Sequence, residues 1–367
     1  MKANKRFLSK YLPTNIYMPN LRDMYEEVGQ EPKYILDILD LPRTTENIQL
    51  YISWKTARDT IICWKIFSEQ LGTSVVDVPI SSMSMLELSE KAATFDEWVD
   101  KNRRAISNLK ELNFSSNQLN FLPKAIETCT TLQKLDLSRN RLESFPETIP
   151  RLTTLQELNL SENKLRSLPD DFGELKNLQA LNLSTNRLAS LPNSISSLSH
   201  LQKLYLSDNF LKTLPDQIGK LSDLQDFNLS KNALKSLPDS IRGLSKLQRL
   251  NLQSNMINRP PESIGCLSNL RELNLSCNEY LDVVPTWVGS LSELRALDLS
   301  GNWIENLPYE MAKLTKLQKL DLSGNELCVV PEWIRDLSNL RELYLSENRI
   351  TSIPESIGSR SGLHVHL

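Results

Sequence analysis

The residues that could carry catalysis in this 367-residue chain are few and scattered. A nucleophilic cysteine needs a base beside it, and a structural zinc site needs cysteines in close pairs. The five cysteines, which show no paired spacing, are Cys63, Cys129, Cys266, Cys277 and Cys328. An odd number of unclustered cysteines is typical of a reducing compartment, so we predict a cytoplasmic protein.

Histidine offers equally little chemistry. His364 and His366 stand two residues apart, so on a strand both side chains would share one face. Two ligands without a third make a poor metal site. The sequence also lacks the motifs G-x-x-x-x-G-K-[ST], G-x-S-x-G and H-E-x-x-H. We therefore predict no catalytic residue, no metal and no cofactor, and a protein that is not an enzyme.

Composition excludes further classes of function. The 42 lysine and arginine residues nearly balance the 45 acidic residues, whereas nucleic acid and acidic membranes attract a basic face. No apolar run approaches the roughly 20 residues that span a bilayer. The first 22 residues lack the apolar stretch of a secretory signal. These features predict no nucleic-acid partner and no membrane span.

An internal repeat determines the elements that would position any functional surface. One asparagine recurs every 23 residues, with a single step of 24, and a proline follows each asparagine six or seven residues later. Eleven units of the form L-x-x-L-x-L-x-x-N-x-L-x-x-L-P-x-x-I-x-x-L-x-x occupy residues 109–362. The eleven asparagines are Asn117, Asn140, Asn163, Asn186, Asn209, Asn232, Asn255, Asn278, Asn302, Asn325 and Asn348.

Each unit predicts a short strand that turns into an outer segment. The two leucines of L-x-L lie on one face, and stacked units bury them in one continuous core. An asparagine amide both donates and accepts, so it can satisfy the backbone groups that the turn leaves inside the core and form a ladder. The proline fixes φ where the outer segment begins. Parallel strands about 4.8 Å apart would form a wall roughly 50 Å long.

This pattern resembles the leucine-rich repeat family over about 70% of the chain. The outer half L-P-x-x-I-G-x-L is similar to the intracellular 23-residue subclass found in Ras-pathway scaffolds and plant intracellular repeat proteins. That half is represented by Leu214, Pro215, Ile218, Gly219 and Leu221. Bacterial effectors delivered into host cells also use such arrays. The resemblance implies an α/β solenoid, a horseshoe with a parallel concave sheet, that binds other proteins.

Residues 1–108 lack the repeat and predict an all-α region. Residues 20–41 predict one or two short helices, and Thr45 begins a helix over about 46–71 that Gly72 ends. Ser84 and Glu87 form a capping box for a further helix over about 85–107. The open end of a solenoid exposes core leucines and needs a covering element with a polar outer face. The first interpretation of residues 1–108 is therefore an N-terminal cap. The alternatives are an independent docking domain and, in the first 20 or so residues, a delivery signal.

The C-terminal end predicts less protection. The repeat stops after Ile357, and residues 363–367 predict a last short strand without a capping helix. Such an end is a natural stop, an edge that pairs with another strand, or a truncation. We expect a monomer.

A partner is expected at the variable positions of the wall. The residue after each ladder asparagine should face outward, and it is basic in the first repeats and apolar in the middle ones. Apolar residues bordered by charge are typical of interfaces, and Tyr, Trp and Arg are frequent hot spots. The predicted contact residues are Tyr205, Phe210, Arg249, Met256, Trp303, Arg139 and Arg141. The alternative is drift among repeats, which exposes isolated apolar residues on any surface.

Two irregularities and one regularity complete the pattern. A double proline, Pro260 and Pro261, replaces the usual Leu-Pro, and one extra residue near Tyr280 lengthens the next repeat. Both are either tolerated changes in surface turns or a change of curvature that shapes the site. Charges alternate in sign along the first position of successive strands, which predicts salt bridges between neighbouring strands.

The sequence therefore predicts a scaffold or adaptor that binds a protein partner on the concave face and the adjacent flank. A bacterial effector acting on host proteins in the host cytoplasm is a special case of this function. The alternative is a recruiting or regulatory subunit of a ligase or phosphatase complex that works through its N-terminal helices. A self-assembling structural protein is a third possibility.

Overall fold

The computed structural model describes residues 45–73 and 85–367. The chain divides into two compact units, Met1–Leu152 and Thr153–Leu367. The helices predicted over residues 20–41, and Ser84 of the predicted capping box, lie outside the described residues. The division at 1–108, 109–362 and 363–367, which follows the repeat pattern, stays a prediction.

The first helix described in unit one is α4, which spans Thr45–Gln70. It ends before Gly72, whose φ of +66° is a left-handed conformation that glycine adopts without steric cost. The predicted helix over about 46–71 and its end at Gly72 are confirmed.

The single helix predicted over about 85–107 is wrong, because two helices meet there. They are α5 (Met85–Ala93) and α6 (Phe95–Ile106). At the junction the Thr94 N–H donates to the Lys91 carbonyl, three residues back, at 3.1 Å. The Thr94 hydroxyl donates to the same carbonyl at 2.8 Å. This tighter turn ends one α-helix and starts the next.

Aromatic rings join these helices to the first repeat. Phe67 of α4 lies between Phe95, at a ring-centroid distance of 6.3 Å, and Phe114, at 5.8 Å in an edge-to-face arrangement. Phe114 directly follows strand β1 (Glu111–Asn113), which pairs in parallel with β2 (Lys134–Asp136). The outer segments of this unit are the 3-10 turns η2 (Lys124–Thr128) and η3 (Ile149–Arg151). The apolar side of the helices is therefore buried against the start of the repeat array.

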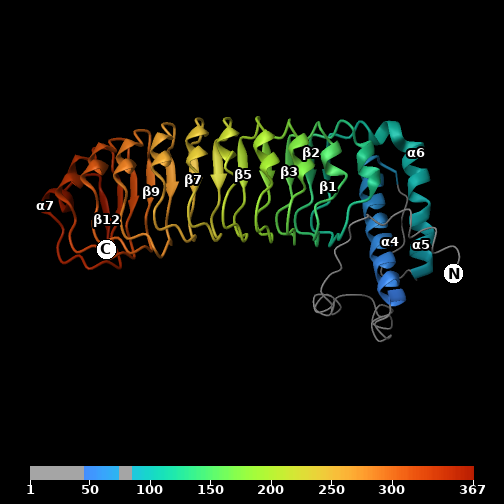
Figure 1. The fold of residues 1–367 in the computed structure, drawn as a ribbon, viewed down its shortest axis with the longest axis horizontal. Helices are drawn as coiled ribbons and strands as arrows, with labels where there is room; N and C mark the ends of the chain where they lie inside the picture. Colours follow the sequence, from blue (N-terminus) through green and yellow to red (C-terminus); the bar gives the residue numbers. More distant parts are fainter. Residues whose placement is uncertain (1–44, 74–84) are drawn as a thin grey trace. The chain divides into compact units, whose positions relative to one another are not determined.

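Unit two is a stack of repeats whose short strands pair in parallel and follow the order of the sequence (Figure 1). Equivalent positions lie opposite one another, as in the pairing of Asn159 with Asn182. The strands are β3 (Glu157–Asn159), β4 (Ala180–Asn182), β5 (Lys203–Tyr205), β6 (Asp226–Asn228), β7 (Arg249–Asn251), β8 (Glu272–Asn274), β9 (Ala296–Asp298), β10 (Lys319–Asp321), β11 (Glu342–Tyr344) and β12 (His364–His366). The prediction of an α/β solenoid with a parallel sheet is confirmed.

The outer segments are single 3-10 turns. A proline with extended backbone commonly precedes them, as Pro192 does with φ −68° and ψ 151°. They are η4 (Asp170–Glu174), η5 (Asn193–Ser197), η6 (Ile218–Lys220), η7 (Asp239–Gly243), η8 (Glu262–Cys266), η9 (Thr286–Ser290), η10 (Tyr309–Lys313) and η11 (Glu332–Asp336), followed by a short helix, α7 (Glu355–Gly358). In the double-proline repeat, Pro260 is buried and its carbonyl accepts from the Trp287 indole N–H at 3.3 Å. The proline that replaces leucine is thus accommodated by a neighbouring side chain.

The ladder asparagines join consecutive repeats through backbone groups. The Asn186 side-chain amide donates to the Leu160 carbonyl of the preceding repeat at 2.9 Å and to the Leu183 carbonyl of its own at 3.1 Å. Its oxygen accepts from the Leu165 N–H at 3.0 Å. The same arrangement recurs at Asn140, Asn209, Asn232, Asn255, Asn278, Asn325 and Asn348. Each amide thereby satisfies core carbonyls that a strand of three residues leaves without ladder partners.

Candidate functional site

The strand face of unit two, meaning the exposed side chains of β3–β12, carries a polar cluster on three neighbouring strands. The Tyr205 hydroxyl of β5 donates to Asp226 Oδ2 of β6 at 3.0 Å. Arg249 of β7 donates to the same oxygen from Nε at 3.1 Å and from Nη2 at 2.8 Å. The structure thus brings together two predicted contact residues through a carboxylate that the prediction did not include.

Electrostatics fix the protonation state of this cluster. Partial burial, reinforced by the neighbouring Asp226 carboxylate, raises the pKa of Tyr205. The hydrogen bonds to Asp226 raise the pKa of Arg249 above its already high value. Both groups therefore keep their protons, and the cluster presents the remaining Arg249 N–H donors and the Tyr205 hydroxyl oxygen as an acceptor, rather than an acid–base pair.

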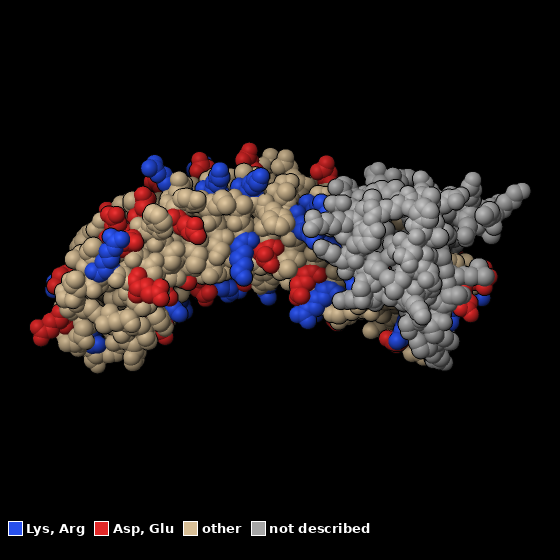
Figure 2. Space-filling view, turned by 90° about the horizontal axis from the view of Figure 1, so that it is seen from below, with Lys and Arg blue, Asp and Glu red and all other residues tan. Residues whose placement is uncertain are grey.

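The predicted salt bridges between neighbouring strands are confirmed. Arg249 and Asp226 are 2.8 Å apart, and Lys319 and Glu342 are 3.8 Å apart on β10 and β11. In unit one, Lys134 and Glu111 are 3.6 Å apart. Basic and acidic residues are interspersed over the described surface in Figure 2 rather than gathered by sign. Exposed pairs of this kind contribute little to the free energy of unfolding, so their main effect is to keep the surface of the strands polar.

A second tyrosine cluster, absent from the sequence prediction, lies on the last strands. The rings of Tyr344 and His366 stack with centroids 4.2 Å apart and planes 7° apart. The Lys319 ammonium lies 4.9 Å from the Tyr344 ring centre, and the Tyr344 hydroxyl donates to Glu342 at 3.1 Å. Tyr205 and Tyr344 both occupy the last position of the three-residue strand, between two buried leucines, and that shared position was the signal that could have identified this cluster.

The other predicted contact residues lie apart from the strand clusters. Phe210, Met256 and Trp303 are exposed by 60%, 45% and 64%, each directly after a ladder asparagine. Arg139 and Arg141 belong to unit one, where Arg139 has a left-handed φ of 56° and the Arg141 N–H donates to the Leu119 carbonyl at 2.8 Å. The outward-facing position expected from the sequence is exposed at each of the three apolar residues.

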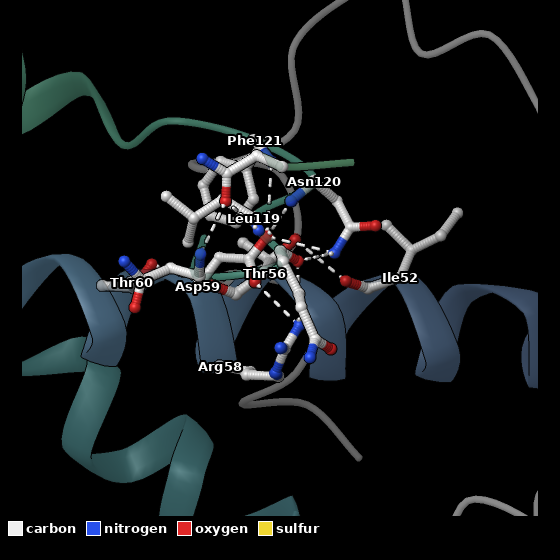
Figure 3. Close-up of polar contacts among 11 residues, drawn as sticks. Ile52, Thr56, Arg58, Asp59, Thr60, Leu119, Asn120 and Phe121 are labelled. Atoms are coloured by element: carbon white, nitrogen blue, oxygen red, sulfur yellow. Dashed lines mark hydrogen bonds and ion pairs between the residues drawn. The ribbon is translucent and has the colours of Figure 1, made fainter. Parts of the chain in front are cut away.

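Asp59 is a buried carboxylate that no sequence motif singles out. This α4 residue has no exposed surface, and its Oδ2 accepts from the Asn120 N–H at 2.7 Å and the Phe121 N–H at 3.3 Å (Figure 3). Arg58 lies 3.3 Å from its other oxygen. Burial raises the pKa of Asp59 to about 6, against the lowering effect of Arg58 and the hydrogen bonds. The contact ties α4 to the turn that follows β1 in the first repeat.

The cysteines have the properties of packing residues or plain surface residues. All five are free, and Cys63 and Cys129 are buried. Burial raises the pKa of the Cys129 thiol to about 12, and burial together with the Asp59 charge raises that of Cys63 well above its ordinary value. A thiol that holds its proton so firmly is a poor nucleophile.

The described residues contain neither a group of side chains suited to a metal ion nor a helix suited to a membrane. Among the side chains described, no group of three or more His, Cys, Asp or Glu is placed to hold a metal ion. In the ranges 45–73 and 85–367, no helix combines the length and apolar character that crossing a bilayer requires.

Family models match most of the repeat array. A model of the leucine-rich repeat region matches residues 193–285. A second leucine-rich repeat model matches residues 130–188 and 268–327, and a third matches residues 108–129 and 339–359. No match is found among curated proteins.

Solved structures of bacterial and plant proteins share the fold. A leucine-rich repeat protein of Leptospira interrogans is 29% identical, with a TM-score of 0.54, and the match covers 73% of this chain and 86% of that one. The plant peptide hormone receptor RGFR1, solved in complex with RGF2, is 33% identical with a TM-score of 0.63, covering 71% and 43%.

A third similar structure is the ectodomain of the receptor kinase GASSHO1/SCHENGEN3 from Arabidopsis thaliana. It is 28% identical with a TM-score of 0.51, and the match covers 71% of this chain and 38% of that one. This chain therefore spans less than half the length of the two plant chains. The repeat period, the parallel strands, the asparagine ladder and the three family models together establish that this chain is a leucine-rich repeat protein.

Proposed function

We propose that this chain binds a protein partner on its strand face and the adjacent flank, and that it acts as a scaffold or adaptor. The observation that carries the proposal is the Tyr205–Asp226–Arg249 cluster. It is held on three rigid strands, so its donors are already ordered before a partner arrives, and ordered donors cost less entropy on binding. Tyrosine and arginine are also the residue types that dominate binding energy in interfaces.

The similar structures support a binding role. The plant receptor that is 33% identical was solved with a peptide hormone, and the Arabidopsis ectodomain was solved with Casparian strip integrity factor 2. Both are repeat arrays that hold a polypeptide. We extend that role, without the identity of the ligand, to this chain.

The cellular role is proposed on narrower grounds. Five cysteines without paired spacing support a reducing, cytoplasmic location. A repeat protein of the same fold occurs in the bacterium Leptospira interrogans, and the bacterial effector is kept as a special case of the proposal. The N-terminal helices use their apolar side internally, with Phe67 and Phe95 buried, which favours a cap over a recruiting module.

The test compares capture of partners by the full chain and by three variants, each checked by circular dichroism. One variant changes the strand face (Tyr205→Ala with Arg249→Ala), and one changes the flank (Phe210→Glu with Trp303→Glu). The control is Tyr309→Glu, because Tyr309 is 71% exposed but lies on the outer turn η10. Captured proteins are identified by mass spectrometry.

We expect a partner that the wild type and the Tyr309 variant retain and that at least one site variant loses by about tenfold or more. Such a result supports the function and tells which surface carries it. A partner retained equally by all four proteins would overturn the proposed surface. Capture of nothing above background by the wild type, in lysates from several sources, would overturn the binding role.

A further inference from the structure

One residue from each of five consecutive repeats forms a line along the flank of unit two. We name this line the lateral stripe; it consists of Phe210, Ala233, Met256, Tyr280 and Trp303. The backbone keeps it in register. The N–H groups of Ala233, Met256 and Trp303 each donate to the carbonyl of the leucine after the preceding member, and between Met256 and Tyr280 the Ile257 N–H instead donates to Asn278 Oδ1 at 3.0 Å. The Ala233 N–H bonds to the Leu211 carbonyl and the Met256 N–H to the Leu234 carbonyl, both at 2.9 Å. Neighbouring members are therefore adjacent in space.

Tyr280 takes its place in the stripe because of the one-residue insertion. Counting from the ladder asparagine puts Glu279 at this position, as in the sequence pattern. In the structure, Leu281 is the leucine that corresponds to Leu234. It is fully buried, and its carbonyl accepts from the Trp303 N–H at 3.0 Å, as the Leu234 carbonyl accepts from the Met256 N–H. Tyr280 is the residue directly before that leucine and is 62% exposed. The insertion places Tyr280 directly before the buried leucine, with Glu279 exposed beside it.

The stripe is apolar along its length and ends in charge on both sides. The equivalent residue in the repeat before Phe210 is Arg187, and the one in the repeat after Trp303 is Glu326, which pairs with Arg349. An exposed apolar line with charged ends is the composition of an interface core with its rim.

The spacing of the stripe selects the shape of its occupant. Repeats follow one another at about the distance between strands, roughly 4.8 Å. An α-helix repeats one face every 5.4 Å, and a slight tilt shortens that projection, so successive turns can meet successive repeats. A β-strand repeats one face about every 6.7 Å and loses register within two repeats. Five repeats match a helix of about 15 residues.

Charge beside the stripe sets the direction of such a helix. The residue two positions after each member lies on the same side of an extended backbone, because the residue between them is buried. These flanking residues are all exposed and change from basic to acidic along the line: Lys212, Lys235, Asn258, Asp282 and Glu305. A complementary helix has an acidic end beside Lys212 and a basic end beside Glu305. Because acidic residues stabilise a helix at its N-terminus and basic residues at its C-terminus, the acidic end is the first turn. Its N-terminus then lies beside Phe210.

We propose that the lateral stripe binds an amphipathic α-helix of a partner protein, acidic at its N-terminus and basic at its C-terminus, with its N-terminal end at Phe210. The proposal rests on the proposed protein-binding function and goes further by stating what kind of segment is bound, where, and in which direction.

The test uses a displayed library of helical peptides of about 18 residues, selected on the immobilised full chain. Leucines are fixed at i, i+4, i+7 and i+11, and the first and last turns are randomised among Glu, Gln and Lys. We expect selection to enrich Glu in the first turn and Lys in the last. The enriched peptide, labelled for fluorescence anisotropy, is then compared with a twin whose two charged turns are exchanged, and we expect the twin to bind at least about tenfold more weakly.

The variants locate the peptide. Tyr280→Glu should weaken binding at least about tenfold, whereas Tyr309→Glu, equally exposed but off the stripe, should leave it unchanged. The inference is overturned if no peptide is enriched, if charge order is random, or if Tyr280→Glu binds as well as wild type. A natural partner that depends on Tyr205 and Arg249 but not on Tyr280 would also overturn it, while the protein-binding function would stand.

Discussion

At the scale of single residues, the buried environment of Asp59 destabilises the ionised form of its carboxyl group. It is fully buried, and burial raises its pKa from 3.8 to about 6 although it accepts two backbone N–H bonds. The folded state therefore binds a proton between pH 4 and 6 that the unfolded state has already released. The stability of the contact between α4 and the first repeat rises as the pH falls from 7 to 4.

The first prediction measures this linkage. Local opening free energies of the Asn120 and Phe121 amides, from hydrogen exchange corrected for intrinsic rates, should rise by on the order of 3 kcal/mol as the pH falls from 7 to 4. Asp59→Asn keeps an acceptor without the charge and should flatten that profile. As a control, Asp223→Asn changes a half-buried carboxyl whose pKa is lowered by its hydrogen bond with Lys246, and it should leave these two amides unaffected. The same slope in wild type and Asp59→Asn would contradict the assignment.

The second prediction concerns a ladder asparagine. Asn278 is fully buried, and its amide donates to the carbonyls of Leu252 and Leu275. Asn278→Asp removes both donations and places a charge in the core, so the free energy of unfolding should fall by about 3 kcal/mol or more. Asn117→Asp should cost about 1 kcal/mol, since the amide of half-buried Asn117 donates to Ser115. Urea titrations followed by circular dichroism compare the two, and equal losses would contradict the difference in burial.

Residue identity alone predicted the ladder but neither Asp59 nor Tyr280. The ladder positions recur eleven times, so one physical argument applies to all of them. Asp59 meets Asn120, which is 61 residues away in the chain, and nothing in the local sequence indicates that contact. Counting from the asparagine placed Glu279 at the outward position, where it is exposed, but that count did not show that Tyr280 stands directly before the buried Leu281.

At the scale of elements, the outer turns pack closely enough to require glycine. A Cβ on Gly219 would lie 1.8 Å from the Ser240 carbonyl oxygen, and one on Gly289 would lie 2.3 Å from the Glu310 carbonyl oxygen. Neither has a left-handed φ, so close approach rather than backbone conformation excludes a side chain. The turns η6 and η7, and likewise η9 and η10, are thus held at a distance that only glycine permits at these two positions.

The third prediction tests this packing. Gly219→Ala should lower the free energy of unfolding by about 2 kcal/mol or more, because the turn must move away from Ser240. Gly358→Ala is the matched control, since its Cβ would meet only a methyl group of Ile353 at 3.9 Å. It should change stability by less than about 1 kcal/mol. Similar losses in both variants, measured by urea unfolding, would show that the turns can separate freely.

Elements without the repeat were predicted less well. The helix of α4 followed from its apolar residues and its terminal glycine. The break at Thr94 did not, because Thr94 is compatible with a continuous helix and only the 3-10 hydrogen bond to Lys91 marks the junction. A periodic pattern indicates that a helix exists more reliably than where it is interrupted.

At the scale of the whole molecule, the repeat gave the architecture. A constant period, a leucine pair and an asparagine are sufficient to predict parallel strands stacked in sequence order, because one unit cannot bury its leucines alone. The site was harder to predict. Its chemistry depends on residues such as Asp226, whose carboxylate accepts hydrogen bonds from side chains of two other repeats. A periodic pattern does not show which of the non-repeating side chains contact one another.

The extra residue in the turn after Asn278 changes which residue stands directly before the buried leucine of that repeat. Asn278 and Leu281 keep their places in the core, and the turn between them presents two exposed side chains, those of Glu279 and Tyr280, where the other repeats present one. The buried core is unchanged by the one-residue insertion, whereas the exposed surface of the turn gains a tyrosine. Short insertions and deletions in these turns therefore offer such a protein a route to new specificity that leaves its stability largely intact.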